Sequence, residues 1–241
     1  MPSASSSPRS VRLLLGLTLF TFFFLLGTRS LNEPDEARSA EIAREMVETG
    51  GWFVPHRDKP PLTYWAVAAS LKLFGLNEWA VRLPIALAGL SGVWAAWLLG
   101  RSLGGRDAAR WSVLILLSST LYFVMSRMLT TDIFLTQFVA WVAYFFWRCW
   151  RSLDGLSDAG EDQRARAARQ SFVWQLLGWT ALAGGFLTKG PVALALPAVV
   201  GGALLFYRRG EVARLNVLLL GAMAGVTLFS ALALPWYLMV F

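Results

Sequence analysis

The sequence is poor in the residues that many enzyme centres use. Of its 241 residues, only one is a cysteine and only one is a histidine. Cys149 lies inside an apolar run, so an internal disulfide and a multi-cysteine metal site are excluded. His56 has no candidate serine beside it, which argues against a Ser-His-Asp triad. The sequence also has no Gly-rich phosphate loop and no internal repeat.

Charge is scarce as well. Only 15% of the residues are charged, 56% are hydrophobic, and the mean hydropathy is +0.52. A chain of this length and apolarity is an integral membrane protein. The net charge of +7 comes from short clusters between apolar runs, without a basic stripe beside stacking aromatics, so we expect no nucleic-acid partner.

Apolar runs of about 17 to 25 residues, the length that spans a bilayer, recur along the chain. They predict an all-α polytopic membrane protein with about seven transmembrane helices in one domain, residues 11–241, behind a disordered lead at 1–10. The first run is long for a signal peptide and lacks a small-residue cleavage site, so it is expected to remain as a helix. The runs are 11–27, 79–100, 111–126, 132–150, 172–188, 190–207 and 215–241.

Residues 62–75 are apolar but too short to cross a bilayer, and they carry Lys72. We interpret them as an interfacial or re-entrant helix. The loops then alternate so that the whole surplus of +7 falls on the side of the N-terminus, including the polar loop 151–171. The positive-inside rule therefore predicts a membrane protein with a cytoplasmic N-terminus and a first outer loop at 29–78, which the family resemblance given below places in the periplasm of a bacterial inner membrane protein.

The polar stretch 31–65 interrupts the apolar pattern. Pro34 fits the first position of a helix and Gly50 its end, and apolar residues recur between them at helical spacing. This predicts a second interfacial helix with Asp35 and Glu36 in its first turn. The simpler interpretation is that the two acids only complement the helix dipole.

The predicted topology gathers most of the conspicuous polar residues on the outer face. Ionisable groups at membrane level are costly and are usually paired or functional. Asp132 and Lys189 each stand alone between apolar runs, so they are expected to face one another or a shared ligand. A purely structural ion pair between two helices is the alternative. The residues predicted at the outer ends of their helices are Asp35, Glu36, Lys59, Asp132, Lys189 and the segment 235–237.

Acids beside cations at a membrane surface suit group transfer from a lipid phosphate sugar. A carboxylate can take the proton of an acceptor hydroxyl, or orient it, while lysine or arginine neutralises the departing phosphate. A divalent metal held by His56, Asp58 and an outer glutamate is conceivable, although a single histidine is weak evidence for it.

Several motifs in this order resemble the membrane glycosyltransferases of the protein O-mannosyltransferase type, especially the bacterial aminoarabinose transferases that modify lipid A. The motifs are EPDEARSAEIAREM, WFVP, KPPLTYW, RLP, MLTTDIFL, LTKGP and PWYL. The resemblance runs from about residue 11 to the end. It implies a C-type glycosyltransferase fold, a polyprenyl phosphate sugar donor, a lipid or protein acceptor and inverting transfer on the periplasmic side.

The resemblance also implies roles for particular residues. Asp35 matches the catalytic acid of the first outer loop, with Glu36 beside it. Lys59 matches the lysine of the KPP motif. The adjacent Arg57, and Tyr64 in KPPLTYW, are further substrate-binding candidates. Asp132 and Lys189 match the acid and the lysine of the second and third outer loops.

This sequence departs from the family in two ways. Only three residues, 56–58, separate WFVP from KPP, so the loop over the donor is shorter than usual. Family members are roughly twice as long, and the chain is expected to be a fragment, a truncated product or half of a split protein. Two rival functions stay open: a non-catalytic protein that binds or flips the lipid carrier, and an inactive fragment.

Overall fold

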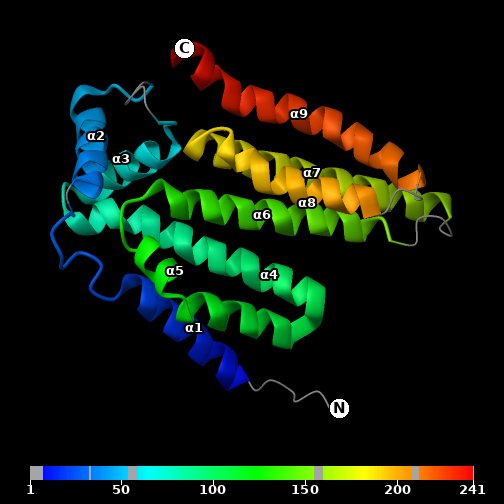
Figure 1. Cartoon of the computed structure of the whole chain (residues 1–241), viewed down its shortest axis with the longest axis horizontal. Helices are drawn as coiled ribbons and strands as arrows, with labels where there is room; N and C mark the ends of the chain where they lie inside the picture. The colour runs from blue at the N-terminus through cyan, green and yellow to red at the C-terminus, as the bar shows by residue number, and fades with distance from the viewer. Residues whose placement is uncertain (1–7, 33, 54–58, 155–159, 208–211, 241) are drawn as a thin grey trace.

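The computed structural model describes residues 8–32, 34–53, 59–154, 160–207 and 212–240. Every regular element in these ranges is a helix, as predicted from the sequence (Figure 1). The helices are α1 (Pro8–Phe23), α2 (Asp35–Thr49), α3 (Leu62–Phe74), α4 (Glu78–Ser118), α5 (Thr120–Met125), α6 (Thr131–Ser152), α7 (Glu161–Lys189), α8 (Val192–Tyr207) and α9 (Val212–Val240).

Helix α4 folds back on itself. Gly104 (φ −136°, ψ 20°) and Gly105 (φ 76°, ψ −158°) leave helical geometry, and the chain reverses direction there (Figure 1). A positive φ with extended ψ is readily adopted only by glycine. The first arm of α4 corresponds to the apolar run predicted at 79–100, and the second arm contains the first part of the run predicted at 111–126.

Two predicted boundaries were wrong. The expected single helix at 111–126 is broken at Ser119, whose extended backbone (φ −75°, ψ 110°) ends α4 and whose hydroxyl caps α5 by accepting from Tyr122 N–H. The loop expected at 151–171 is shorter, because α7 already begins at Glu161. The first turn of α7 carries Glu161 and Asp162, which complement the helix dipole. The start of α7 is therefore helical although its residues are polar.

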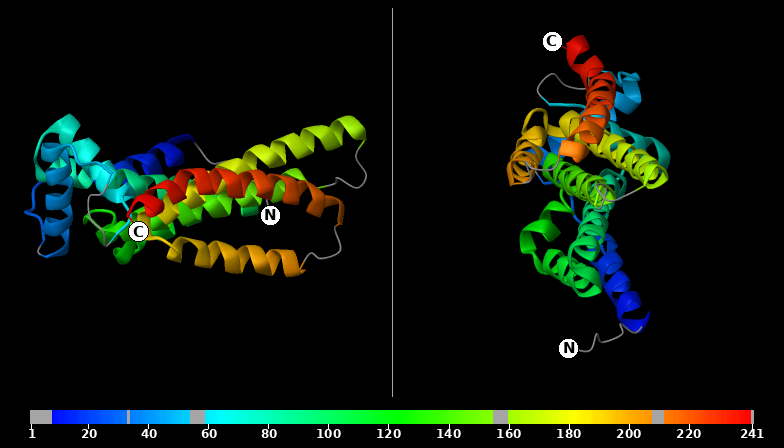
Figure 2. Two further views of the ribbon diagram at one scale, coloured as in Figure 1. Left: turned by 90° about the horizontal axis from the view of Figure 1, so that it is seen from above. Right: turned by 90° about the vertical axis from the view of Figure 1, so that its right-hand side faces the viewer.

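The short helices α2 and α3 have the predicted start and stop residues. Helix α2 follows Pro34 and ends at Gly50, which has a left-handed conformation (φ 72°) and donates its N–H to Met46 O. Helix α3 follows Pro61 and ends at Gly75. In Figure 2 both helices lie at one end of the bundle, and α2 runs across its long axis. We call this end, where α2 and α3 lie, the site end.

One core cluster joins α1 through α6. It includes Phe22 of α1, Ala43 of α2, Val67 of α3, Ile85 of α4 and Ile133 of α6. These side chains are at most 1% exposed. Helices α7 and α9 pack on one another and add smaller clusters beside it.

The helices differ in whether they are long and apolar enough to cross a bilayer. Among the described residues, Glu78–Ser118 and Leu218–Val240 are long and apolar enough to cross a bilayer by length and composition, and Leu13–Phe23 and Leu62–Phe74 are shorter apolar helices. The shortness of α3 agrees with its prediction as a non-crossing helix. The count of about seven crossings stays a prediction.

Candidate functional site

The predicted site residues that the structure describes belong to elements that meet at the site end. Asp35 is the first residue of α2 and is exposed. Lys59 is also exposed and precedes the two prolines before α3. The start of α6 and the end of α7 lie at the same end of the bundle, as Figures 1 and 2 show. Arg57, with the metal candidates His56 and Asp58, lies outside the described residues.

Asp132 and Lys189 are in contact. Lys189 Nζ forms an ion pair with Asp132 Oδ1, which confirms the expected proximity. Asp132 lies in the first turn of α6 and Lys189 is the last residue of α7, so each charge also complements its own helix dipole. Their side chains are 53% and 40% exposed, so both remain accessible to a ligand. The contact agrees equally with a structural pair and with a shared ligand site.

Tyr64 lies differently from the charged candidates. Its side chain is only 3% exposed and belongs to the main core cluster. A substrate cannot contact most of this residue without displacing its packing, so its burial favours a structural contribution to the start of α3.

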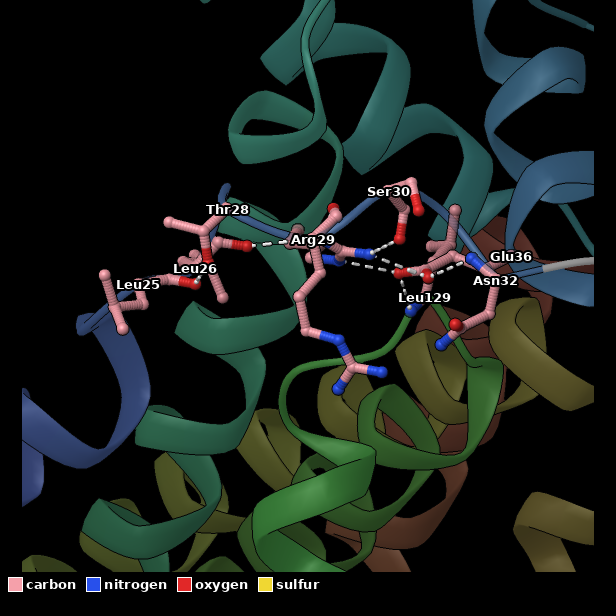
Figure 3. Close-up of polar contacts among 9 residues, drawn as sticks. Leu25, Leu26, Thr28, Arg29, Ser30, Asn32, Glu36 and Leu129 are labelled. Carbon is pink, nitrogen blue, oxygen red and sulfur yellow. Dashed lines mark hydrogen bonds and ion pairs between the residues drawn. The ribbon is translucent and has the colours of Figure 1, made fainter.

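Glu36 is buried in an ion pair with Arg82 of α4. Arg82 Nε donates to Glu36 Oε1 and Nη2 donates to Oε2, both at 2.9 Å (Figure 3). The two side chains are 1% and 5% exposed. Backbone N–H groups complete the contacts: Asn32 donates to Oε2 at 2.9 Å and Leu129 donates to Oε1 at 3.1 Å. Four donors therefore occupy the carboxylate.

The guanidinium of Arg82 also holds the turn between α1 and α2. Nη1 donates to Arg29 O at 2.6 Å and to Leu26 O at 3.3 Å, and Nη2 donates to Ser30 O at 2.9 Å. We call Glu36, Arg82 and these backbone partners the clamp. It joins the α1–α2 turn, α2, α4 and the loop before α6, which are the elements that place Asp35 and Asp132 (Figure 3).

The clamp determines the charge state of Glu36. Burial raises the pKa of its carboxyl. Three contributions lower this pKa: the hydrogen bond from Arg82, the hydrogen bonds from the N–H groups of Asn32 and Leu129, and the positive charge of Arg82. Together they outweigh the effect of burial. The net result is a pKa below the usual value. Glu36 is thus held as an anion whose oxygens are already used, which suits positioning and not proton transfer.

Sequence reasoning missed Arg82 as a site residue and treated the two adjacent acids alike. Successive residues on a helix point about 100° apart, so one of two neighbours can face inward while the other faces outward. Here Glu36 is buried and Asp35 is exposed. The available signal was an arginine flanked by apolar residues in RLP, which needs a partner when buried.

Aromatic side chains tie the loops of the site end together. Trp65 Nε1 donates to Trp52 O at 2.6 Å, and Trp236 Nε1 donates to Phe53 O at 2.9 Å. Tyr237 Oη donates to Phe186 O at 3.1 Å, near the end of α7. The PWYL segment of α9 therefore contacts the loop after α2, at Phe53, and also α7, the helix that carries Lys189.

Among the described residues, no group of three His, Cys, Asp or Glu side chains is placed to hold a metal ion. Asp35, Lys59 and the Asp132–Lys189 pair instead form a set of exposed charges at the site end. An all-helical membrane protein with acids and cations at one end of its bundle is the class that fold and site define.

Known proteins agree with this class. Residues 58–157 match the family described as dolichyl-phosphate-mannose-protein mannosyltransferase. An undecaprenyl phosphate-α-4-amino-4-deoxy-L-arabinose arabinosyl transferase from Pseudomonas savastanoi pv. phaseolicola is 32% identical over 96% of this chain and 42% of its own length. A transferase 2 of the same name from Proteus mirabilis is 33% identical over 92% of this chain and 38% of its own length.

The fold matches as well. The crystal structure of ArnT from Cupriavidus metallidurans in the apo state superposes with a TM-score of 0.80 at 30% identity, over 96% of this chain and 42% of that one. The structure of the same protein bound to undecaprenyl phosphate gives a TM-score of 0.81 over 98% of this chain. The chain is thus related in sequence and fold to the aminoarabinose transferase-like membrane glycosyltransferases, and it spans about two fifths of their length.

The clamp predicts a defined acid sensitivity. Glu36→Gln should lower the free energy of unfolding at pH 7 by about 3 to 5 kcal/mol, because it leaves Arg82 buried without its counter-ion. The pKa of Glu36 in the folded protein is below 4.5, the ordinary value of a glutamate. The ion pair therefore contributes fully to the free energy of unfolding above pH 4.5, and this contribution is lost as the pH falls through the pKa of the folded state. Unfolding measured in detergent between pH 7 and pH 3 should therefore show a flatter acid limb for the variant.

Glu45→Gln is the matched control, because Glu45 is exposed on the same helix. It should leave stability within about 0.5 kcal/mol of the parent. Equal acid limbs for the parent and Glu36→Gln would show that the carboxylate is not held as described.

Proposed function

We propose that the protein takes part in transferring a sugar from a polyprenyl phosphate donor to a lipid A-like or protein acceptor at a membrane face. The single observation that supports this most is the fold, which matches 98% of the chain to a protein crystallised with undecaprenyl phosphate. The exposed charges at the site end supply the chemistry that such a transfer needs. Because the chain spans about two fifths of its relatives, the activity of the whole transferase is part of the proposal.

Lys59 is proposed to bind the donor phosphate. It is exposed and lies between α2 and the prolines that begin α3, at the end of the bundle where headgroups would lie. A cation there stabilises the charge that develops on the departing phosphate more than it stabilises the bound donor, which lowers the barrier. Arg57, two residues earlier, is proposed to assist it.

Asp35 is proposed as the general base that takes the proton of the acceptor hydroxyl. It is the exposed member of the acid pair, whereas Glu36 is occupied by the clamp. The role of Glu36 in this proposal is to position the first turn of α2. Asp132 and Lys189 are proposed to bind polar groups of the substrate, since their charges are about half exposed.

A second candidate function is donor binding or flipping without transfer. It is favoured by the exposed Lys59 at the site end, because a cation alone is sufficient to hold a lipid phosphate. This function needs Lys59 and does not need Asp35 as a base.

We further propose that the protein lies in the bacterial inner membrane with its site end on the periplasmic side. The surplus of +7 on the N-terminal side supports this orientation. Helix α1 runs from Pro8 toward the site end (Figure 1). One crossing by α1 then places the site on the far side of the membrane.

The two functions are separated by paired substitutions. Lys59→Ala should weaken binding of undecaprenyl phosphate to this chain in detergent about tenfold or more, because a charge-assisted contact is lost. Asp35→Asn should leave that binding unchanged. Turnover is measured in a chimera in which residues 1–241 replace the matched segment of the Pseudomonas savastanoi transferase, where Asp35→Asn should reduce transfer by about 10² to 10⁴.

Glu45→Gln, on the same helix, should affect neither readout. Normal turnover with Asp35→Asn in an active chimera would exclude Asp35 as the base. Unchanged donor affinity with Lys59→Ala would exclude the phosphate role of Lys59.

Orientation is tested by single cysteines. A cysteine at Ser39, on α2, should react with an impermeant thiol reagent added to the periplasmic side of spheroplasts, and one at Ser157 should react only after lysis. The natural Cys149 is buried and provides the background, measured in the unchanged chain. Labelling of Ser157→Cys in intact spheroplasts with protection of Ser39→Cys would reverse the proposed orientation.

A further inference from the structure

A small cavity lies beside the clamp, between the end of α1 and the segment that follows α4. Its volume is about 80 Å³. None of the residues proposed for sugar transfer lines it. The lining residues are Leu25, Leu26, Arg29, Asn32, Arg82, Phe123, Val124, Arg127 and Met128.

Three arginines, Arg29, Arg82 and Arg127, line this one cavity. Among the described residues, Glu36, which pairs with Arg82, is the carboxylate in contact with the group. Burial and the positive charges of Arg82 and Arg29 lower the pKa of Arg127, as expected for like charges held close together. Counted over the described residues, the cluster has a net positive charge, which an anion in the cavity would offset.

Two of the three arginines have structural partners. Arg82 belongs to the clamp, and Arg127 caps the end of α1 by donating to Thr21 O at 3.0 Å and to Phe24 O at 2.6 Å. Such contacts satisfy the free carbonyls at a helix C-terminus. The positions of the Arg82 and Arg127 side chains are therefore explained by their contacts within the protein.

Arg29 is different. Its backbone carbonyl accepts from Arg82, but the structure gives its guanidinium no hydrogen bond or ion pair with any described residue. In Figure 3 the guanidinium of Arg29 and the carboxamide of Asn32 extend from the clamp toward the same side, next to the loop that carries Leu129. A rigid fork of donors and an amide beside it form a suitable cradle for a phosphate group.

The rim of the cavity is apolar and accessible. Leu25 is 55% exposed and Phe123 is 39% exposed, and Phe24, next in the chain to Leu25, is 52% exposed and stacks on Phe20. Exposed apolar side chains such as these are suited to contact acyl chains. Leu25 at this rim also has a positive φ of 54°, which is a strained conformation for leucine.

We propose that this cavity is a second anion site, separate from the donor site, which binds the phosphate group of a membrane lipid through Arg29, with Arg127, Arg82 and Asn32 around it. The apolar rim favours a phosphate that carries acyl chains over free inorganic phosphate. Binding there would connect the lipid headgroup layer to the clamp, since Arg29 supplies one of the carbonyls that Arg82 holds.

The test measures thermal unfolding of the chain in an uncharged detergent. Short-chain phosphatidic acid (dioctanoyl) is compared with dioctanoylglycerol, which lacks the phosphate, and with inorganic phosphate at constant ionic strength. Phosphatidic acid should raise the melting temperature and dioctanoylglycerol should not. Arg29→Gln should raise the half-saturating concentration about tenfold or more, through loss of charge-assisted hydrogen bonds.

Two controls place the site. Arg101→Gln removes an arginine that lies over Trp97 near the turn of α4 at Gly104 and Gly105, and it should respond like the parent. Lys59→Ala should also respond like the parent, because Lys59 does not line this cavity. Arg29→Glu should abolish the response while the chain still folds, since a carboxylate there faces Arg127 and Arg82.

Stabilisation by inorganic phosphate equal to that by phosphatidic acid, and lost in Arg29→Gln, would support the anion site with free phosphate as its ligand. Three results would overturn the proposal: no response to either phosphate, an equal response in the parent and Arg29→Gln, or a response lost in Lys59→Ala and kept in Arg29→Gln. The last result would place the bound phosphate in the donor site instead.

Discussion

The buried ion pair between Glu36 and Arg82 holds the site end of this protein together. Arg82 lies in the first arm of α4 and reaches the turn between α1 and α2 through three backbone carbonyls, while Glu36 accepts the N–H of Leu129 before α6. Such a pair is costly to bury and is stable only when every donor and acceptor has a partner. Here the partners come from four separate elements, so the pair fixes their relative positions.

This constraint gives the two acids of the DE pair different roles. With Glu36 directed inward and fully hydrogen-bonded, Asp35 is left exposed on the first turn of α2. A catalytic group works best on an element whose own contacts are rigid. Tryptophan contacts add to this rigidity, because Trp236 of α9 and Trp65 of α3 hold the backbone at residues 52 and 53.

Much of the fold follows from local signals. Pro34 and Gly50 bound α2 correctly, and the length of α3 separated it from the crossing helices. The contact of Asp132 with Lys189 could be predicted because each is a lone charge at a helix end. The polar start of α7 was missed because hydropathy detects membrane segments and not the solvated turns that extend them.

The partner of Glu36 could not be predicted from the sequence. It lies 46 positions away in a helix whose apolar pattern gives no reason to favour one acid over another. Nor does composition reveal a cavity, so the gathering of Arg29, Arg82 and Arg127 became visible only when α1 and the segment after α4 were placed together. Both features depend on the path of the α1–α2 turn, which has no periodic pattern to read.

The most direct test of this account is a double-mutant cycle on the clamp. Unfolding free energies of the parent, Glu36→Gln, Arg82→Gln and the double variant would be measured in mixed micelles by titration with sodium dodecyl sulfate. The account predicts a coupling energy of about 2 kcal/mol or more, because each single change leaves a buried charge and the double change removes both. Additive effects, within about 0.5 kcal/mol, would show that Glu36 and Arg82 act independently and would contradict the central claim.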